Sequence, residues 1–123
     1  MRSSMHTITT LAEAEALITR VEPVWIFKHS NTCPVSSAAA EEVAAFLAAR
    51  PMPHGMVVVQ ESRPVSNWLA TRLAYVHQSP QLFLIRDGKV AWQASHWGIT
   101  QIAMTKALEQ RPPLEPSCNV ASL

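Results

Sequence analysis

Two uninterrupted apolar runs in the 123-residue chain, at residues 24–27 and 56–59, predict two buried strands. Both runs are rich in β-branched or aromatic residues and lack polar alternation, which is typical of strands covered on both faces. Between them, residues 34–50 carry apolar side chains at helical spacing, and prolines then prevent the helix from continuing. A right-handed crossover through this helix makes the two strands parallel. The apolar stripe consists of Val35, Ala39, Val43, Phe46 and Leu47.

Capping residues predict three further helices. Thr9 and Thr10 precede the first, Ser66 is the expected N-cap of one that runs through Ala74, and Thr100 precedes the last. Pro64 then belongs to the loop before the middle helix. The inward-facing residues are expected to be Leu11, Ala14, Leu17 and Ile18 in the first, Leu69 and Leu73 in the second, and Ile102, Ala103, Met104 and Leu108 in the third.

A hairpin is predicted near the end of the chain, where apolar residues 81–85 and 90–94 flank an Asp87-Gly88 pair. This dipeptide tolerates the positive φ of a tight turn, so the last two strands should be antiparallel. After the first helix the predicted order is therefore β-α-β-α-β-β-α. This order predicts an α/β protein with one mixed sheet.

Composition narrows the class of protein. A content of 48% hydrophobic and 15% charged residues is typical of a globular protein. We expect one domain over residues 1–110 and a proline-rich flexible tail at 111–123. A net charge of +1 and the absence of basic runs argue against nucleic acid and anionic membranes as partners. No apolar run approaches the length of a membrane span or resembles a signal peptide. Two cysteines are too few for a secreted disulfide framework, so we expect a cytoplasmic protein.

The candidate chemistry centres on Cys33, which stands where the first strand ends and the long helix begins. Pro34 suits the first helical position, because its missing N–H costs nothing there and its fixed φ matches a helix. Cys33 is then the N-cap, and its sulfur should face free N–H groups at the positive end of the helix dipole. These groups favour the thiolate, which is the form that attacks disulfides. Ser36 stands where a second cysteine would complete a Cys-x-x-Cys motif, so a mixed disulfide has no neighbouring thiol to resolve it.

Several segments resemble known redox proteins. The predicted element order looks like the thioredoxin fold, a four-stranded mixed sheet with helices on both faces. The cysteine motif resembles the glutaredoxin active site more than that of thioredoxin, and the wider matches resemble the YtxJ-type monothiol bacilliredoxins over most of residues 8–110. The matching segments are Phe27-Lys28-His29-Ser30, Thr32-Cys33-Pro34-Val35-Ser36, Arg63-Pro64-Val65-Ser66-Asn67, Ser79-Pro80-Gln81, Ser95-His96-Trp97 and Ile99-Thr100.

The resemblance implies a thiol-disulfide oxidoreductase that removes bacillithiol, or a similar low-molecular-weight thiol, from mixed disulfides on protein cysteines. Cys33 would be the catalytic nucleophile, supported by Thr32, Pro34 and Ser36. The small thiol would be a co-substrate, and no bound cofactor or metal is expected. The implied partners are S-thiolated proteins, the small thiol and its reductase, and the protein would act as a monomer.

The same resemblance implies a substrate-binding edge. A cis Ser79–Pro80 bond would pack beside Cys33 and expose the backbone of Ser79 to an extended segment of the substrate. Lys28 and Arg63 would hold carboxylates of the small thiol, or alternatively would be solvated surface charges. His29, His96 and Trp97 are left outside the catalytic set.

Other interpretations of these residues stay open. Cys33 could be an inert core cysteine, Ser36 an ordinary first-turn serine bonded to backbone, and Pro80 the start of an edge strand. Cys118 is expected to be a free thiol in the tail, and a resolving cysteine is the alternative. The cysteines and histidines show no zinc spacing.

Two other functions are considered. Some monothiol glutaredoxins share an iron-sulfur cluster between two subunits, but they carry Cys-Gly-Phe-Ser, whereas this chain has Cys-Pro-Val-Ser. A non-catalytic module of the same fold could instead present its Ser79–Pro80 edge to a partner without turnover. A thiol adduct on Cys33 would favour exchange, whereas brown colour and a dimer would favour cluster carriage.

Overall fold

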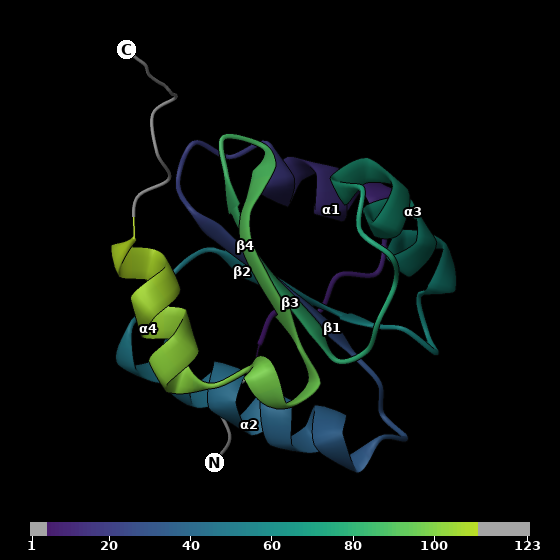
Figure 1. Ribbon diagram of the computed structural model, residues 1–123. Helices are drawn as coiled ribbons and strands as arrows, with labels where there is room; N and C mark the ends of the chain where they lie inside the picture. Colours follow the sequence, from purple (N-terminus) through teal and green to yellow (C-terminus); the bar gives the residue numbers. More distant parts are fainter. Residues whose placement is uncertain (1–4, 111–123) are drawn as a thin grey trace.

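The computed structural model describes residues 5–110, which form one sheet with helices on both faces (Figure 1). The predicted tail, with Cys118, lies outside the described residues. The elements in chain order are α1 (Leu11–Ile18), β1 (Val24–His29), α2 (Pro34–Ala49), β2 (His54–Val58), α3 (Arg63–Leu73), β3 (Gln81–Arg86), β4 (Lys89–Ser95), the short 3₁₀ helix η1 (His96–Gly98) and α4 (Gln101–Glu109).

The strands lie in the order β2-β1-β3-β4. β1 pairs with β2 in parallel, as the crossover predicted, while β3 is antiparallel to both β1 and β4. Lys28 near the end of β1 lies opposite Gln81 at the start of β3. The carboxyl ends of the two parallel strands and the amino end of β3 therefore meet at one edge of the sheet, where α2 begins.

Alternation along the strands builds two cores. Ile26 of β1 and Phe83 of β3 face α1 and α3, whereas Phe27 and Leu82 face α2 and α4. Figure 1 shows the two helix pairs on opposite sides of the sheet. No helix within residues 5–110 is long and apolar enough to span a membrane.

Local capping and turn signals are confirmed. Thr10 accepts a hydrogen bond from the backbone N–H of Glu13, whose carboxylate bonds back to the Thr10 N–H, which completes a capping box. Thr100 caps α4 by accepting from the Ala103 N–H. Asp87 and Gly88 have φ of 54° and 76°, so both central residues of the hairpin turn have the positive φ that a tight turn of this kind requires.

Three sequence predictions are wrong in detail. The helix expected from Ser66 begins at Arg63 with Ser62 as N-cap, because proline is tolerated in a first turn where its N–H would have no partner. Ser66 is therefore a buried residue inside α3. Leu11 and Ile102, expected to face inward, are 46% and 71% exposed, because each lies in the first turn of its helix, beyond the sheet face that the later turns cover.

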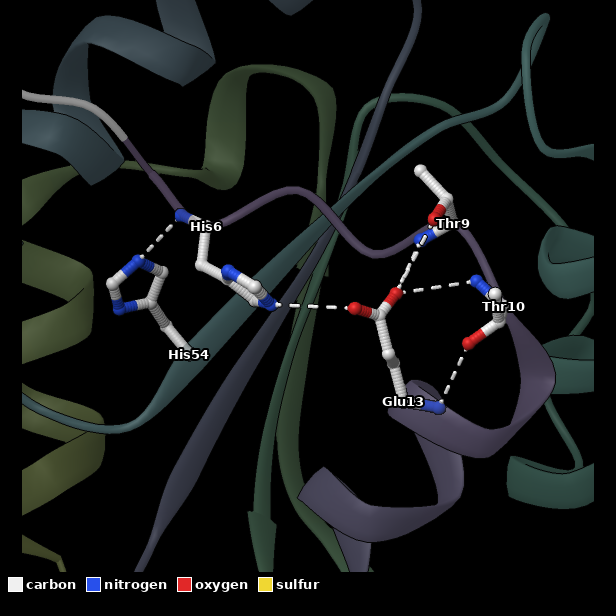
Figure 2. A network of polar contacts seen from close by, with 5 residues as sticks. All are labelled: His6, Thr9, Thr10, Glu13 and His54. Atoms are coloured by element: carbon white, nitrogen blue, oxygen red, sulfur yellow. Dashed lines mark hydrogen bonds and ion pairs between the residues drawn. The ribbon is translucent and has the colours of Figure 1, made fainter.

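The N-terminal residues add an unpredicted contact to β2 (Figure 2). Thr7 forms a parallel bridge with Met56, and the His6 backbone N–H donates to His54 Nε2 at 3.0 Å. The carboxylate of Glu13 lies 4.0 Å from His6 Nε2. His54 pairs with Trp25 near the start of β1, so this network is at the opposite end of the sheet from Cys33.

Candidate functional site

Cys33 occupies the N-cap of α2, as predicted, with φ −110° and ψ 120° and Pro34 directly after it. Its carbonyl accepts the N–H groups of Ser36 and Ser37 at 3.0 and 3.2 Å, which starts the helix. The thiol is partly exposed. It makes no capping hydrogen bond with the first turn, so the expected direct contact with N–H donors is not formed in this structure. The position at the positive end of the helix dipole remains.

Ser36 anchors the loop before the cysteine. Its side chain is fully buried, and its hydroxyl accepts a hydrogen bond from the Ser30 backbone N–H at 2.9 Å. The same oxygen lies 2.8 Å from His29 Nδ1. The interpretation of Ser36 as a first-turn serine that satisfies backbone is therefore confirmed. Its role as a member of the active site stays a prediction.

A second anchor, Gln60, comes from the segment after β2 and was missed by sequence reasoning. Its amide nitrogen donates to Ser30 Oγ at 2.8 Å and to Thr32 Oγ1 at 3.2 Å, and its carbonyl accepts the Asn31 N–H at 3.2 Å. Thr32 is thus held in the loop through its side chain. No local signal marks Gln60, because it reaches this loop only after β1 and β2 pair in parallel.

The Ser79–Pro80 bond is cis, and Pro80 is buried directly before β3. The Pro80 carbonyl accepts the His96 backbone N–H at 3.1 Å, which ties it to η1. His96 has a φ of 54°, and the next residue, Trp97, is 72% exposed. Packing within the fold therefore does not explain why a large aromatic side chain stands at position 97. Pro80 and Cys33 lie at the same sheet edge, because β3 starts opposite the end of β1.

Lys28 is not a solvated surface charge, because its side chain is fully buried on the α3 side of the sheet. Its ammonium donates to the Ser66 carbonyl at 3.2 Å. Burial lowers the pKa of Lys28 to about 8. Arg63, in contrast, is exposed at the first position of α3, as expected for a surface charge.

His29 lies on the opposite face of β1, beside Phe27, with ring centroids 5.7 Å apart. Burial lowers the pKa of His29, and the hydrogen bond with Ser36 opposes this shift. The imidazole is therefore neutral at physiological pH. In that state it can share a proton with the Ser36 hydroxyl without placing a charge in the loop.

The part of the chain that the structure describes holds no group of three or more cysteine, histidine or carboxylate side chains arranged for a metal ion. Cys33 is the one cysteine within it. The chemistry available at this edge, within the described residues, is therefore that of a single thiol at a helix terminus, and the same edge carries a buried cis-proline.

Comparison with known proteins places the chain among the thioredoxin-fold thiol-disulfide oxidoreductases. An inferred oxidoreductase with a thioredoxin fold is 30% identical and superposes with a TM-score of 0.81, covering 85% of this chain and 94% of its own. Mitochondrial thioredoxin 3 from Saccharomyces cerevisiae, oxidised form, is 18% identical with a TM-score of 0.69, over 85% of this chain and 93% of that one. Thioredoxin from Fasciola hepatica is 19% identical with a TM-score of 0.70, over 85% of this chain and 96% of that one. These two likenesses show the fold alone.

The family is shown by sequence. The model of the family "Monothiol bacilliredoxin BrxC" matches residues 6–104, so the chain belongs to the monothiol bacilliredoxins. The match includes both the cysteine motif and the Ser79–Pro80 edge.

Replacing Ser36 by alanine should destabilise the fold. The Ser30 N–H is buried and would lose its acceptor, which costs about 1 to 3 kcal/mol. Ser37→Ala is the matched control, because Ser37 is exposed in the same helical turn and should change the free energy of unfolding by less than about 0.5 kcal/mol. Urea unfolding of both variants measures the difference. Equal losses in the two variants would show that the Ser36 hydroxyl does not anchor the loop.

Burial of Lys28 should make stability rise at alkaline pH. Its pKa is about 8 in the folded protein, against an ordinary value of 10.5, so between these values the unfolded chain binds more protons. The free energy of unfolding should increase across this window by at most about 3 kcal/mol. Lys28→Met should lack the increase, whereas Lys106→Met, at an exposed position, should keep it. Urea titrations at pH 7.5 and 10.5 test this. An identical pH response in Lys28→Met and wild type would contradict it.

Proposed function

We propose that this protein removes a low-molecular-weight thiol, bacillithiol in the first place, from mixed disulfides on protein cysteines, with Cys33 as the nucleophile. The observation that carries the proposal is one partly exposed cysteine at the N-cap of α2, with serine three residues on, at the sheet edge where the cis-proline Pro80 precedes β3. The proposal is supported by membership of the monothiol bacilliredoxin family.

The exchange proceeds in two balanced steps. The Cys33 thiolate attacks the sulfur of the small thiol in the mixed disulfide, and the protein thiolate leaves and takes up a proton. Cys33 then carries the small thiol as a disulfide. A second small-thiol molecule, as its thiolate, attacks that adduct and releases the Cys33 thiolate. In total the mixed disulfide and one free small thiol are converted to a free protein cysteine and the disulfide of two small-thiol molecules, which a reductase must recycle.

The need for an external second thiol follows from Ser36. A hydroxyl cannot act as the attacking sulfur, and this one is already engaged with the Ser30 N–H and His29. Thr32 and Pro34 support the nucleophile by fixing the loop and the start of the helix on either side of it.

We assign the protein substrate to the edge formed by Ser79 and Pro80. Ser79 is partly exposed, and its backbone precedes β3 at the end where Cys33 lies, so an extended segment can pair there while its cysteine meets the thiol. The exposed Trp97, tied to Pro80 through His96, offers an aromatic contact next to this edge. We propose that the protein acts as a monomer in the cytoplasm, where free thiols stay reduced.

Cys33→Ser should abolish adduct formation, because the variant lacks the attacking sulfur. Cys118→Ser is the matched control and should form the adduct at the wild-type rate. Mass spectrometry after incubation with the oxidised small thiol detects the mass added to Cys33. If Cys118→Ser instead trapped a stable adduct that the wild type clears, Cys118 would be the resolving thiol and the one-cysteine mechanism would be wrong. Absorbance of an iron-sulfur cluster in the purified protein would favour cluster carriage instead.

Ser36→Cys should convert the site to a dithiol. The introduced thiol is held next to Cys33 in the same helical turn, so it should expel the small thiol and leave an intramolecular disulfide. The wild type should hold its adduct until external thiol is added. The variant should also be less stable than wild type by about 1 kcal/mol or more, because sulfur is a weak acceptor for the Ser30 N–H. Mass spectrometry without added thiol separates the two forms, and equally rapid clearance by the wild type would refute the mechanism.

A further inference from the structure

The two residues directly before the nucleophile are held from outside their loop by one side chain. Gln60 Oε1 accepts the Asn31 N–H at 3.2 Å, and Gln60 Nε2 donates to Thr32 Oγ1 at 3.2 Å. Ser30, the first residue of the loop, has a further anchor in Ser36. Among residues 5–110, the hydrogen bonds of Asn31 and Thr32 reach no partner other than Ser30 and Gln60. The last step to the nucleophile therefore depends on Gln60.

The amide of Gln60 has a fixed orientation. The Asn31 N–H is a backbone group that can only donate, so the atom that it meets is the amide oxygen. The amide nitrogen then faces the hydroxyls of Ser30 and Thr32, at 2.8 and 3.2 Å, and its two N–H groups supply one bond to each. Although Gln60 is exposed, its amide directs three hydrogen bonds to a single loop.

The backbone that carries Gln60 is held on both sides. The Val59 N–H donates to the His29 carbonyl at 2.9 Å, which continues the pairing of β1 with β2 up to the residue before Gln60. After Gln60 the chain turns back, and the Val58 carbonyl accepts the Ser62 N–H at 2.9 Å. Groups carried by rigid elements are placed more precisely than groups carried by loops. Gln60 therefore transmits the position of the sheet to the loop.

The exchange reaction is sensitive to this position. The proposed substrate lies along the Ser79–Pro80 edge before β3, whereas the nucleophile follows β1, so the two reacting sulfurs are carried by different elements. Displacement of a reacting group by about 1 Å is enough to slow a reaction by about a hundredfold. A small alkylating reagent is not bound at the edge and needs no such alignment. Misplacement of the sulfur would therefore slow exchange and spare alkylation.

We propose that Gln60 is a positioning residue of the exchange reaction. Its grip on the loop keeps the sulfur of Cys33 aligned with a disulfide bound at the Ser79–Pro80 edge. The inference rests on the exchange function proposed above. Gln60 acts through the loop and not on the reacting atoms. Its part differs from that of Ser36, which holds the start of the loop from inside α2.

The ratio of two rates at Cys33 tests this assignment. One is the transfer of bacillithiol from a mixed disulfide on an unstructured peptide, and the other is alkylation by iodoacetamide, both followed by mass spectrometry of the peptide that contains Cys33. Gln60→Met keeps the length of the side chain and removes its hydrogen bonds, so the ratio of transfer to alkylation should fall about tenfold. Gln60→Asn is one methylene shorter and should also lower the ratio, which keeps the test valid if Gln60→Met folds poorly.

Gln60→Glu should restore the ratio to within about twofold of wild type. Its carboxylate can accept the Asn31 N–H and also the hydroxyl protons of Ser30 and Thr32, because a hydroxyl donates as well as accepts. Salt at about 0.5 M screens the added charge from both reagents. Gln101→Met is the matched control, because Gln101 is exposed and its side chain makes no hydrogen bond within residues 5–110. This variant should keep the wild-type ratio.

Four results would overturn the positioning role. They are an unchanged ratio in Gln60→Met and Gln60→Asn, an equal fall in Gln101→Met, a ratio in Gln60→Glu as low as in Gln60→Met, and an equal slowing of transfer and alkylation. The last of these would place the effect on the reactivity of the thiol rather than on its position. If wild type itself transferred no bacillithiol, the exchange function would be refuted instead.

Discussion

The site depends on one buried hydrogen bond, from the Ser30 N–H to the Ser36 hydroxyl. The chain must leave β1 and enter α2 within four residues, and this bond fixes the turn from inside the helix. Gln60 holds the same loop from the outer side through Ser30 and Thr32. This bond thereby holds Cys33 at the terminus of α2, at the sheet edge where Pro80 also lies. Neither Cys33 nor Pro80 takes part in the bond itself.

This constraint explains why serine can occupy the place of the second cysteine in a Cys-x-x-Cys motif while the loop before Cys33 stays anchored. A hydroxyl donates and accepts well, so Ser36 can serve the Ser30 N–H and the neutral His29 together. A thiol is a weaker partner for both. One side chain therefore both anchors the loop and leaves the motif, within the described residues, with Cys33 as its single sulfur.

Features set by neighbours in sequence could be predicted, and features set by distant contacts could not. The caps at Thr10 and Thr100 and the position of Cys33 follow from local backbone chemistry, and the uninterrupted apolar runs predicted the buried strands. The resemblance supplied the cis-proline edge. The anchor Gln60 and the burial of Lys28 arise from strand pairing and helix packing, which no local pattern records. The start of α3 differs from the sequence prediction because Pro64 is compatible both with a loop and with the first turn of a helix, where the structure places it.

The most informative mismatch between sequence and fold is Lys28. It occupies the α3-facing position that follows Val24 and Ile26, where a leucine or methionine would pack without desolvating a charge. Its pKa falls to about 8, which is the electrostatic measure of that unfavourable placement. Local choices that oppose stability concentrate at functional sites. This buried ammonium lies two residues from the loop that carries Cys33 and bonds to the Ser66 carbonyl inside α3, so its unfavourable burial falls at the same edge of the sheet as the candidate site.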